Sequence, residues 1–162
     1  MKKTLNILTG FCALLASLVG AGSCCNEPST LVYEYRPVSF EGWNKTDTLL
    51  FSLPEVTQAG VYQGKVGVRT NACYPYQKIW IGVCQTLHQP DTVFLDTVCC
   101  EIVPCSDLDK NGIGLFLSEC PLPEHTYQAG QTGTVKVFHI LRREEVPGVG
   151  QVGLQIQAVL AP

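Results

Sequence analysis

The chain has 162 residues, of which 11 are basic and 14 acidic, so its formal net charge at pH 7 is −3. It has no basic run of the kind that neutralises nucleic-acid phosphates or anionic headgroups, because Arg142-Arg143 is followed at once by Glu144-Glu145. Composition therefore excludes nucleic acid as a partner and argues against purely electrostatic binding to a membrane surface.

The amino terminus has the pattern of a secretory signal peptide. Lys2 and Lys3 form a positive region, and residues 7–20 form a mostly apolar stretch that ends in small residues. This stretch is shorter than the roughly 20 apolar residues that a spanning helix needs. We therefore expect the segment to be cleaved and the remaining chain to be exported.

Small residues at positions 21–23 run directly into Cys24, and this resembles the lipobox read by lipoprotein signal peptidase. The pattern departs at Ala21, where the lipobox usually has a large aliphatic residue. The resemblance implies that residues 1–23 are removed, that Cys24 carries acyl chains such as palmitate, and that residues 24–30 form a tether. Acyl chains contribute about 0.8 kcal/mol per buried methylene, so two or three anchor a protein stably. The alternative is ordinary cleavage near Ala21, which leaves a soluble protein.

Residues 31–162 are expected to form one all-β domain. The chain left after cleavage is long enough to bury roughly 68–70% of its unfolded surface in one core. Val, Ile, Thr, Tyr and Phe recur with period two between turn signals, and no segment keeps a helical period for three turns. This pattern predicts an antiparallel β-sandwich or jelly roll of about eight strands.

The expected strands are separated by turn signals rich in Pro, Gly and Asn. In chain order the strands are residues 31–36, 48–53, 60–69, 78–87, 92–103, 113–118, 133–142 and 151–158. The breaks fall at Pro54, 71–75, 89–91, 111–112, 121–130 and 147–150. The last strand has the clearest alternation, since aliphatic residues at even positions 152–158 alternate with Gly153 and glutamines.

Motifs spread along the chain carry a family resemblance. They are Trp43, Asp47 and Phe51, then Val68-Arg69-Thr70-Asn71, Tyr74-Pro75-Tyr76, Ile79-Trp80-Ile81, Asp91-Thr92, Gly130, Arg142, Pro147-Gly148-Val149 and Val152-Gly153-Leu154. Together they resemble the gliding-motility lipoproteins of the GldH family over nearly the whole exported chain. The chain departs from the family at residues 111–115, which lack a tryptophan, and at Gln155, where an arginine usually stands.

The resemblance implies a lipoprotein of the cell envelope, anchored in the inner or outer membrane and facing the periplasm. It would be similar to components of the gliding machinery that is coupled to protein secretion, with envelope proteins as partners. The implied motif and candidate docking residues are Trp43, Arg69, Asn71, Tyr74, Pro75, Tyr76, Trp80, Arg142, Gly148 and Gly153.

The central motif also has a physical interpretation. Arg69 at a strand end can donate a fork of hydrogen bonds, and Asn71 favours a turn through a side-chain bond to nearby backbone. Tyr74 is biased to extended geometry by Pro75, and Tyr74 and Tyr76 can pack against the rim of the sandwich. The motif is either a corner that fixes strand order or a surface that docks a partner.

Seven cysteines remain once Cys12 leaves with the signal and Cys24 is acylated. Export permits at most three intramolecular disulfides among Cys25, Cys73, Cys84, Cys99, Cys100, Cys105 and Cys120, whose pairing the sequence leaves open. Cys99 and Cys100 should point to opposite faces of one strand. A zinc site of Cys100, Cys105, Cys120 and His125 is disfavoured, because no Cys-x-x-Cys pair occurs.

Residues 107–112 match the start of a calcium loop, with Asp107, Asp109 and Asn111 at alternate positions and glycine sixth. The match fails at the twelfth position, where Ser118 replaces the required acid. A hairpin turn at the Asn-Gly pair is favoured instead, and no metal site is predicted.

No enzymatic activity and no small-molecule cofactor are expected, because no catalytic or nucleotide-binding motif occurs. His139 alternates with aliphatic residues and should be a hydrogen-bonded residue on an apolar face, whereas His88 and His125 are expected in exposed loops. A hydrolase would need a histidine and an acid that converge in a cleft.

Two functions from different classes remain. The first is an accessory lipoprotein that docks protein partners, using sheet edges or the rim around Tyr74 and Tyr76. The second is a glycan-binding jelly roll, which requires Trp43, Trp80 and a tyrosine to line one exposed face. Trp80 is out of phase with Ile79 and Ile81, and its direction is left open by the sequence.

Overall fold

The computed structural model describes residues 29–39, 41–102 and 114–159, which form a two-layer antiparallel sandwich. The ten strands of these residues are β1 (Thr30–Pro37), β2 (Trp43–Asn44), β3 (Leu49–Leu53), β4 (Gly60–Thr70), β5 (Lys78–His88), β6 (Thr92–Glu101), β7 (Phe116–Tyr127), β8 (Thr132–His139), β9 (Glu145–Val146) and β10 (Val149–Ala158). The predicted all-β class is confirmed, although the sequence does not predict the two-residue strands β2 and β9. Within these ranges no helix is long and apolar enough to cross a membrane.

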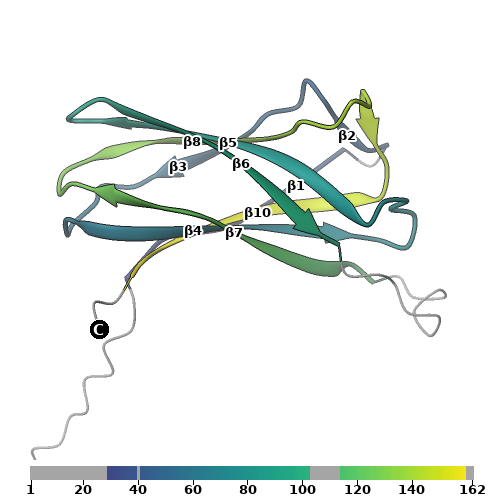
Figure 1. The fold of residues 1–162 in the computed structure, drawn as a ribbon, viewed down its shortest axis with the longest axis horizontal. Helices are drawn as coiled ribbons and strands as arrows, with labels where there is room; N and C mark the ends of the chain where they lie inside the picture. The colour runs from purple at the N-terminus through teal and green to yellow at the C-terminus, as the bar shows by residue number, and fades with distance from the viewer. Residues whose placement is uncertain (1–28, 40, 103–113, 160–162) are drawn as a thin grey trace, which may run out of the picture.

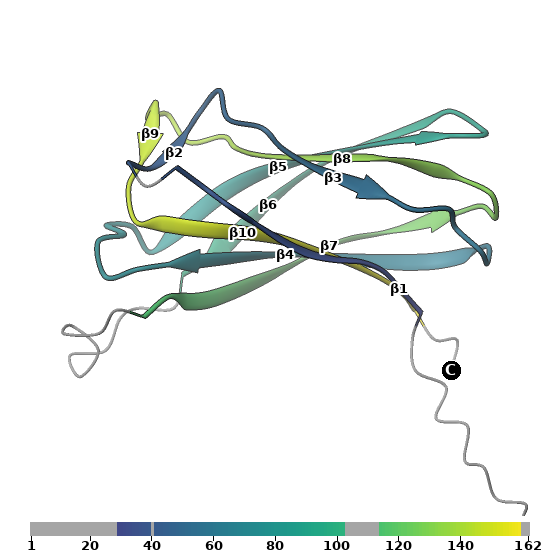
Figure 2. The ribbon, with the colours of Figure 1, turned by 180° about the vertical axis from the view of Figure 1, so that it is seen from behind.

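The strands form two four-stranded sheets that face each other. Sheet I has the order β1-β10-β4-β7, sheet II has the order β3-β8-β5-β6, and β2 pairs with β9 in a short separate ribbon. Figure 1 looks onto the side of the sandwich where β6 and β7 run, and Figure 2 looks onto the side where β1 and β3 run. Each side of the sandwich is therefore bounded by one edge strand from each sheet.

Alternation along the strands puts one apolar face of each sheet into the core. In β10, Val152, Leu154 and Ile156 are buried while the glutamines between them are half-exposed, as the period-two pattern predicts. In β5 of the facing sheet, Ile81 and Val83 are completely buried. Each such aliphatic side chain stabilises the fold by about 1.5–3 kcal/mol relative to its exposed state.

One predicted break is wrong. The sequence predicts a strand over residues 113–118 and a loop over 121–130, but β7 continues through Pro121 and Pro123 to Tyr127. β7 is an edge strand, where proline is tolerated because one side of the strand needs no backbone donor. Ser118, Cys120, Leu122 and Tyr127 of β7 are buried, and this burial outweighs the local turn signal. The other predicted strands agree with the structure to within three residues at their ends.

A disulfide joins the two sheets along the β6–β7 side. Cys100 of β6 is completely buried and bonded to Cys120 of β7. Its neighbour Cys99 lies on the outer face of sheet II, so the predicted opposite orientation of the two cysteines is confirmed. Since Cys100 and Cys120 are bonded to each other, they are not free to ligate zinc, and Cys120 does not pair with Cys105. Cys105 itself lies outside the described residues, as does Cys25.

A second link on the same side is a buried ion pair. Asp96 of β6 lies 2.7 Å from Nε2 of His125 on β7, and the Phe94 ring stacks on the His125 ring with centroids 4.0 Å apart. The prediction that His125 is exposed in a loop is therefore wrong, since its side chain is only 15% exposed. Further along, the Tyr127 hydroxyl donates to the side-chain oxygen of Gln85 between the sheets.

The connections sort to two ends of the sandwich. β1 begins and β10 ends at one end, where the Ala158 N–H donates to the Ser29 carbonyl over 2.8 Å. We call this the terminal end, and it also carries the turns 54–59, 89–91 and 128–131. The opposite end, the loop end, carries the segments 38–48, 71–77 and 140–148 together with β2 and β9 (Figure 2).

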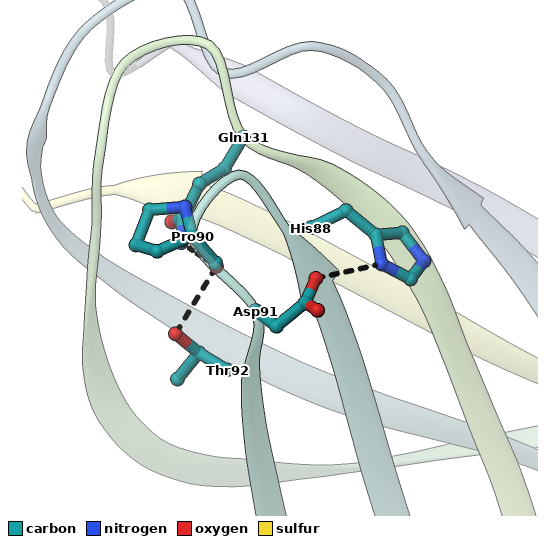
Figure 3. Close-up of polar contacts among 5 residues, drawn as sticks. All are labelled: His88, Pro90, Asp91, Thr92 and Gln131. Carbon is teal, nitrogen blue, oxygen red and sulfur yellow. Dashed lines mark hydrogen bonds and ion pairs between the residues drawn. The ribbon is translucent and has the colours of Figure 1, made fainter.

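The terminal end is tied together by Gln131, which is 2% exposed. Its side-chain nitrogen donates to the Pro90 carbonyl over 3.2 Å (Figure 3), and its backbone carbonyl accepts from the Val56 N–H over 2.8 Å. His88, which is exposed as predicted, lies 3.2 Å from Asp91 in the same turn. Short turns joined by internal hydrogen bonds make this end a compact base for the sandwich.

The disulfide should contribute substantially to stability, because it closes a chain segment of 20 residues. We expect Cys100→Ala combined with Cys120→Ala to lower the free energy of unfolding by about 3 kcal/mol, measured by urea denaturation without reductant. Cys73→Ala is the control, since Cys73 is an exposed free thiol and its removal should leave the midpoint unchanged. Equal stability of the double variant and the parent would contradict the structural role.

Candidate functional site

The loop end contains a pocket of about 460 Å³, which is within the roughly 300–1,000 Å³ usual for binding sites. It opens among the turn after β4, the start of β5, the end of β6 and the start of β7. Aromatic, apolar and polar residues line it: Thr70, Asn71, Ala72, Tyr74, Pro75, Tyr76, Gln77, Lys78, Glu101, Ile102 and Phe116. The structure thus brings together four of the candidate residues from the sequence, namely Asn71 and Tyr74-Pro75-Tyr76.

One wall of the pocket is a turn that Asn71 organises. Its side-chain oxygen accepts from the Cys73 N–H over 2.8 Å, and its carbonyl accepts from the Tyr74 N–H over 3.1 Å. The predicted turn-forming role of Asn71 is confirmed. The Asn71 N–H donates to the Gly148 carbonyl over 2.8 Å, so the two family motifs meet in space. Gly148 has φ +79°, and a Cβ there would overlap the Tyr74 backbone, so both conformation and space require glycine.

The two tyrosines of the motif form an edge-to-face pair. Their ring centroids lie 5.7 Å apart with an interplanar angle of 83°. The Tyr74 hydroxyl donates to the Lys78 carbonyl over 3.1 Å, and burial raises the pKa of this phenol well above its usual value. The Arg143 guanidinium lies 6.0 Å from the Tyr76 ring centroid. Tyr74 is therefore held in place, whereas Tyr76 presents its half-buried ring at the pocket rim.

A charged pair borders the same pocket. Lys78 Nζ lies 3.0 Å from a Glu101 carboxylate oxygen, and both side chains are more than half exposed. This hydrogen bond and the charge of Glu101 raise the pKa of Lys78. Exposed pairs of this kind contribute little to stability. They do give the pocket one positive and one negative group at its mouth, which a polar partner can hydrogen-bond.

Arg69 and Gly153 lie outside the pocket, on the outer face of sheet I. The Arg69 guanidinium donates to the Gln151 side-chain oxygen over 2.7 Å and stacks 4.1 Å from the Tyr35 ring centroid. The Tyr35 ring covers Gly153 and Gly67, which face each other on β10 and β4. A Cβ at either glycine would overlap the ring. These motif residues therefore contribute to packing. Arg69 has the uncharged side chain of Gln151 as its hydrogen-bond acceptor in place of a carboxylate.

Trp43 is completely buried, and this contradicts the arrangement that a glycan platform requires. Its Nε1 donates to the Asp47 carbonyl over 2.9 Å, and its ring meets the His139 ring edge-on. Trp80 instead lies on the outer face of sheet II and is 47% exposed. The two tryptophans thus do not share an exposed face. Arg142 is exposed in the bend that follows β8.

His125 and Asp96 converge away from the pocket at the loop end. Both side chains are buried at the β6–β7 side, and neither lines the pocket at the loop end. Phe94 covers the imidazole ring of His125. In the described ranges no group of three or more His, Cys, Asp or Glu side chains is arranged to hold a metal ion. Asp107, Asp109 and Asn111 of the partial calcium-loop match, like the predicted lipidation residue Cys24, lie outside the described residues.

Several of the contacts that shape the sandwich have no local signal in the sequence. The stacking of Arg69 on Tyr35, the Cys100–Cys120 disulfide and the Asp96–His125 pair each join residues at least 20 positions apart. A signal does exist for Tyr35, because the paired glycines at 67 and 153 leave space that an aromatic ring on a neighbouring strand fills. Strand order is needed before that signal can be used.

A model of the GldH lipoprotein family matches residues 30–156. A search of solved structures finds similarity to a 4-O-methyl-alpha-glucuronidase with specificity for decorated arabinogalactans, with 12% identity and a TM-score of 0.44. That similarity covers 82% of this chain and 18% of the glucuronidase chain, so it supports no functional argument. A search of curated proteins finds no match.

The described residues define a small β-sandwich with a disulfide between its sheets and a pocket among the loops of one end. The chain belongs to the GldH lipoprotein family, because the family model spans most of its length. The predicted family resemblance is therefore confirmed. At the level of the family, the protein is a gliding-motility-associated lipoprotein of the cell envelope, anchored to a membrane.

His139 should make the stability of the sandwich depend on pH. The imidazole is buried, Nε2 donates to the Trp43 carbonyl over 3.1 Å and Nδ1 has no hydrogen-bond partner, which confirms the predicted hydrogen-bonded role on an apolar face. Burial lowers the pKa of His139, while the Trp43 bond partly opposes this shift. The unfolded chain therefore takes up the proton first, and stability present above about pH 6.5 should be lost as the pH falls below that value.

The measurement is urea denaturation between pH 5 and pH 8 of the parent and of His139→Gln, whose amide can still donate to the Trp43 carbonyl. The variant should lose part of the pH dependence, whatever its absolute stability. His88→Gln is the control, because His88 is an exposed residue at the terminal end. A parent and a His139→Gln variant with parallel pH profiles would refute the assignment.

Proposed function

We propose that this lipoprotein is a non-catalytic accessory component of the gliding and secretion machinery, which docks an envelope protein at the loop-end pocket. In this proposal residues 1–23 are a signal peptide, Cys24 carries palmitate and other acyl chains, and residues 24–30 tether the sandwich on the periplasmic side. Family membership supports the envelope setting. The residues around Tyr74 and Tyr76 supply the docking surface.

The observation that carries the proposal is the convergence of two distant motifs at one end of the sandwich. The turn at Asn71 and the segment at Gly148 are hydrogen-bonded to each other, and the pocket opens beside them. A corner that only fixed strand order would not need a pocket of this size. Half-buried tyrosines at a rim are typical anchors of protein interfaces, because each buries a large apolar ring and keeps a polar tip in water.

The position of the tether also supports docking at the loop end. β1 begins at Thr30, only six residues after Cys24, so the terminal end can lie no more than about 20 Å from the anchoring sulfur. β4 has 11 residues and spans roughly 35 Å from the terminal end to the loop end. The terminal end and the loop end lie at opposite ends of the sandwich (Figure 1), so a sandwich standing on its base has its loop end directed away from the bilayer, where an envelope protein can reach the pocket.

Acylation is tested by Cys24→Ser in the full-length protein. We expect loss of labelled palmitate incorporation and transfer of the protein from the membrane fraction to the soluble fraction, since acyl chains supply the membrane affinity. Cys25→Ser is the matched control, because the neighbouring cysteine should not be the acylated residue. Unchanged labelling and membrane retention in Cys24→Ser would overturn the anchor assignment.

Docking is tested by Tyr76→Ala, with chemical crosslinking of the tagged protein in its native envelope and quantitative identification of the crosslinked proteins. A central interface tyrosine contributes about 2 kcal/mol, so recovery of the partner should fall roughly 30-fold. Tyr33→Ala is the control, since Tyr33 is 64% exposed on β1 and lies outside the pocket.

The circular-dichroism spectrum of Tyr76→Ala should match that of the parent, with only a modest fall in thermal midpoint, because the side chain is partly buried against the core and Tyr74. Equal recovery of the same envelope proteins by both tyrosine variants would place docking elsewhere. Measurable polysaccharide affinity without any recovered machinery protein would favour the glycan-binding function instead.

A further inference from the structure

Edge strands present backbone groups that can pair with another chain, and sheets usually protect them. Three of the four edge strands of the two four-stranded sheets carry such protection. β3 has only five residues, β7 contains Pro121 and Pro123, and β1 ends at Pro37. The remaining edge strand, β6, has ten residues and contains neither proline nor a basic residue.

The free side of β6 can be assigned from its pairing. The Ile102 N–H donates to the Gln77 carbonyl over 2.8 Å, on the β5 side, and the register between β5 and β6 runs without a shift. Backbone groups alternate between the two sides of an antiparallel strand. The N–H and C=O groups of the odd residues 93–101 therefore point away from the sheet, at its open edge.

The side chains of the odd residues 93–99 lie on the outer face of sheet II, and they are unusually apolar for an exposed surface. Leu95 is 73% exposed and Val93 is 63% exposed. Residues 80–86 of β5 and 93–99 of β6 have outward side chains that form an uncharged strip: Trp80, Gly82, Cys84, Thr86, Val93, Leu95, Thr97 and Cys99. The acid within β6, Asp96, points inward and is held by His125.

We propose that β6 is a strand-addition site, where an extended segment of a second envelope protein pairs with residues 93–99 and lays alternate apolar side chains on the Leu95 face. Main-chain hydrogen bonds supply affinity in this mode, and alternate side chains supply specificity. Because the exposed strip carries no charge, the matching segment has uncharged, alternately apolar residues. This surface is separate from the loop-end pocket, so it adds a second contact to the docking role.

A second copy of this chain fits the edge less well. Two β6 strands related by a two-fold axis pair antiparallel, which places their terminal ends at opposite ends of the joined sheet. For copies that stand on a bilayer, one base would be raised by roughly 35 Å, whereas six tether residues reach about 20 Å. A lipid surface fits less well too, because acyl chains offer no partners to the outward N–H and C=O groups.

The test is amide hydrogen exchange of the full lipoprotein, pulse-labelled in isolated native envelopes and compared with the detergent-purified protein. The amides of Val93, Leu95, Thr97 and Cys99 should exchange at least tenfold more slowly in envelopes. Leu95→Lys and Thr97→Pro should abolish that difference, the first by charging the strip and the second by removing an outward N–H. Tyr33→Lys, at an exposed site on β1, should retain it.

A thermal midpoint equal to that of the parent shows that Leu95→Lys is folded, since this side chain is mostly solvent-exposed. Three results would overturn the proposal. The first is equal exchange of these amides in envelopes and in the purified protein. The second is slow exchange reproduced by protein-free vesicles of the envelope lipids, which would assign the strip to a membrane surface. The third is a purified dimer that Leu95→Lys dissociates, which would assign the edge to a second copy.

Discussion

The mutual burial of two apolar sheet faces is the constraint on which the rest of this molecule depends. Each sheet can hide only one face, so alternate residues along every long strand must be apolar and must keep one register. That register sends all connections to one of two ends. β1 begins and β10 ends at the same end, and the motifs at Asn71 and Gly148 meet at the other. The pocket lies at the loop end, among the turn after β4 and the adjoining ends of β5, β6 and β7.

The β6–β7 side shows how the sandwich is held closed where its sheets end. The Cys100–Cys120 bond and the Asp96–His125 pair both link inward side chains of the two edge strands. Neither link occupies the outward backbone groups of β6. A covalent and ionic closure beneath the sheet therefore leaves the edge itself available, which is different from closure by strand pairing in a barrel.

The sequence predicts those parts of the fold that depend on local pattern. The period-two alternation of β10 and the Asn71 turn are both recognisable in a few consecutive residues. The continuation of β7 through two prolines is not predictable this way, because proline is tolerated only after strand order has made β7 an edge. The environments of Trp43 and His125 likewise depend on contacts with His139 and Asp96, which are remote in sequence.

The motif residues likewise fall into two groups, those that internal packing explains and those that it does not. Motif residues Arg69, Gly148 and Gly153 are explained by packing, through Tyr35 or through the backbone of Tyr74. Tyr76 makes no comparable internal hydrogen bond among the described contacts, and it stands at the pocket rim. Tyr76 packs partly against the core and leaves the rest of its ring at the pocket, where a partner can contact it. The motif thus forms the predicted corner, in which Asn71 and Gly148 fix the turn. In the docking function that we propose, the same turn supports the tyrosines that contact the partner.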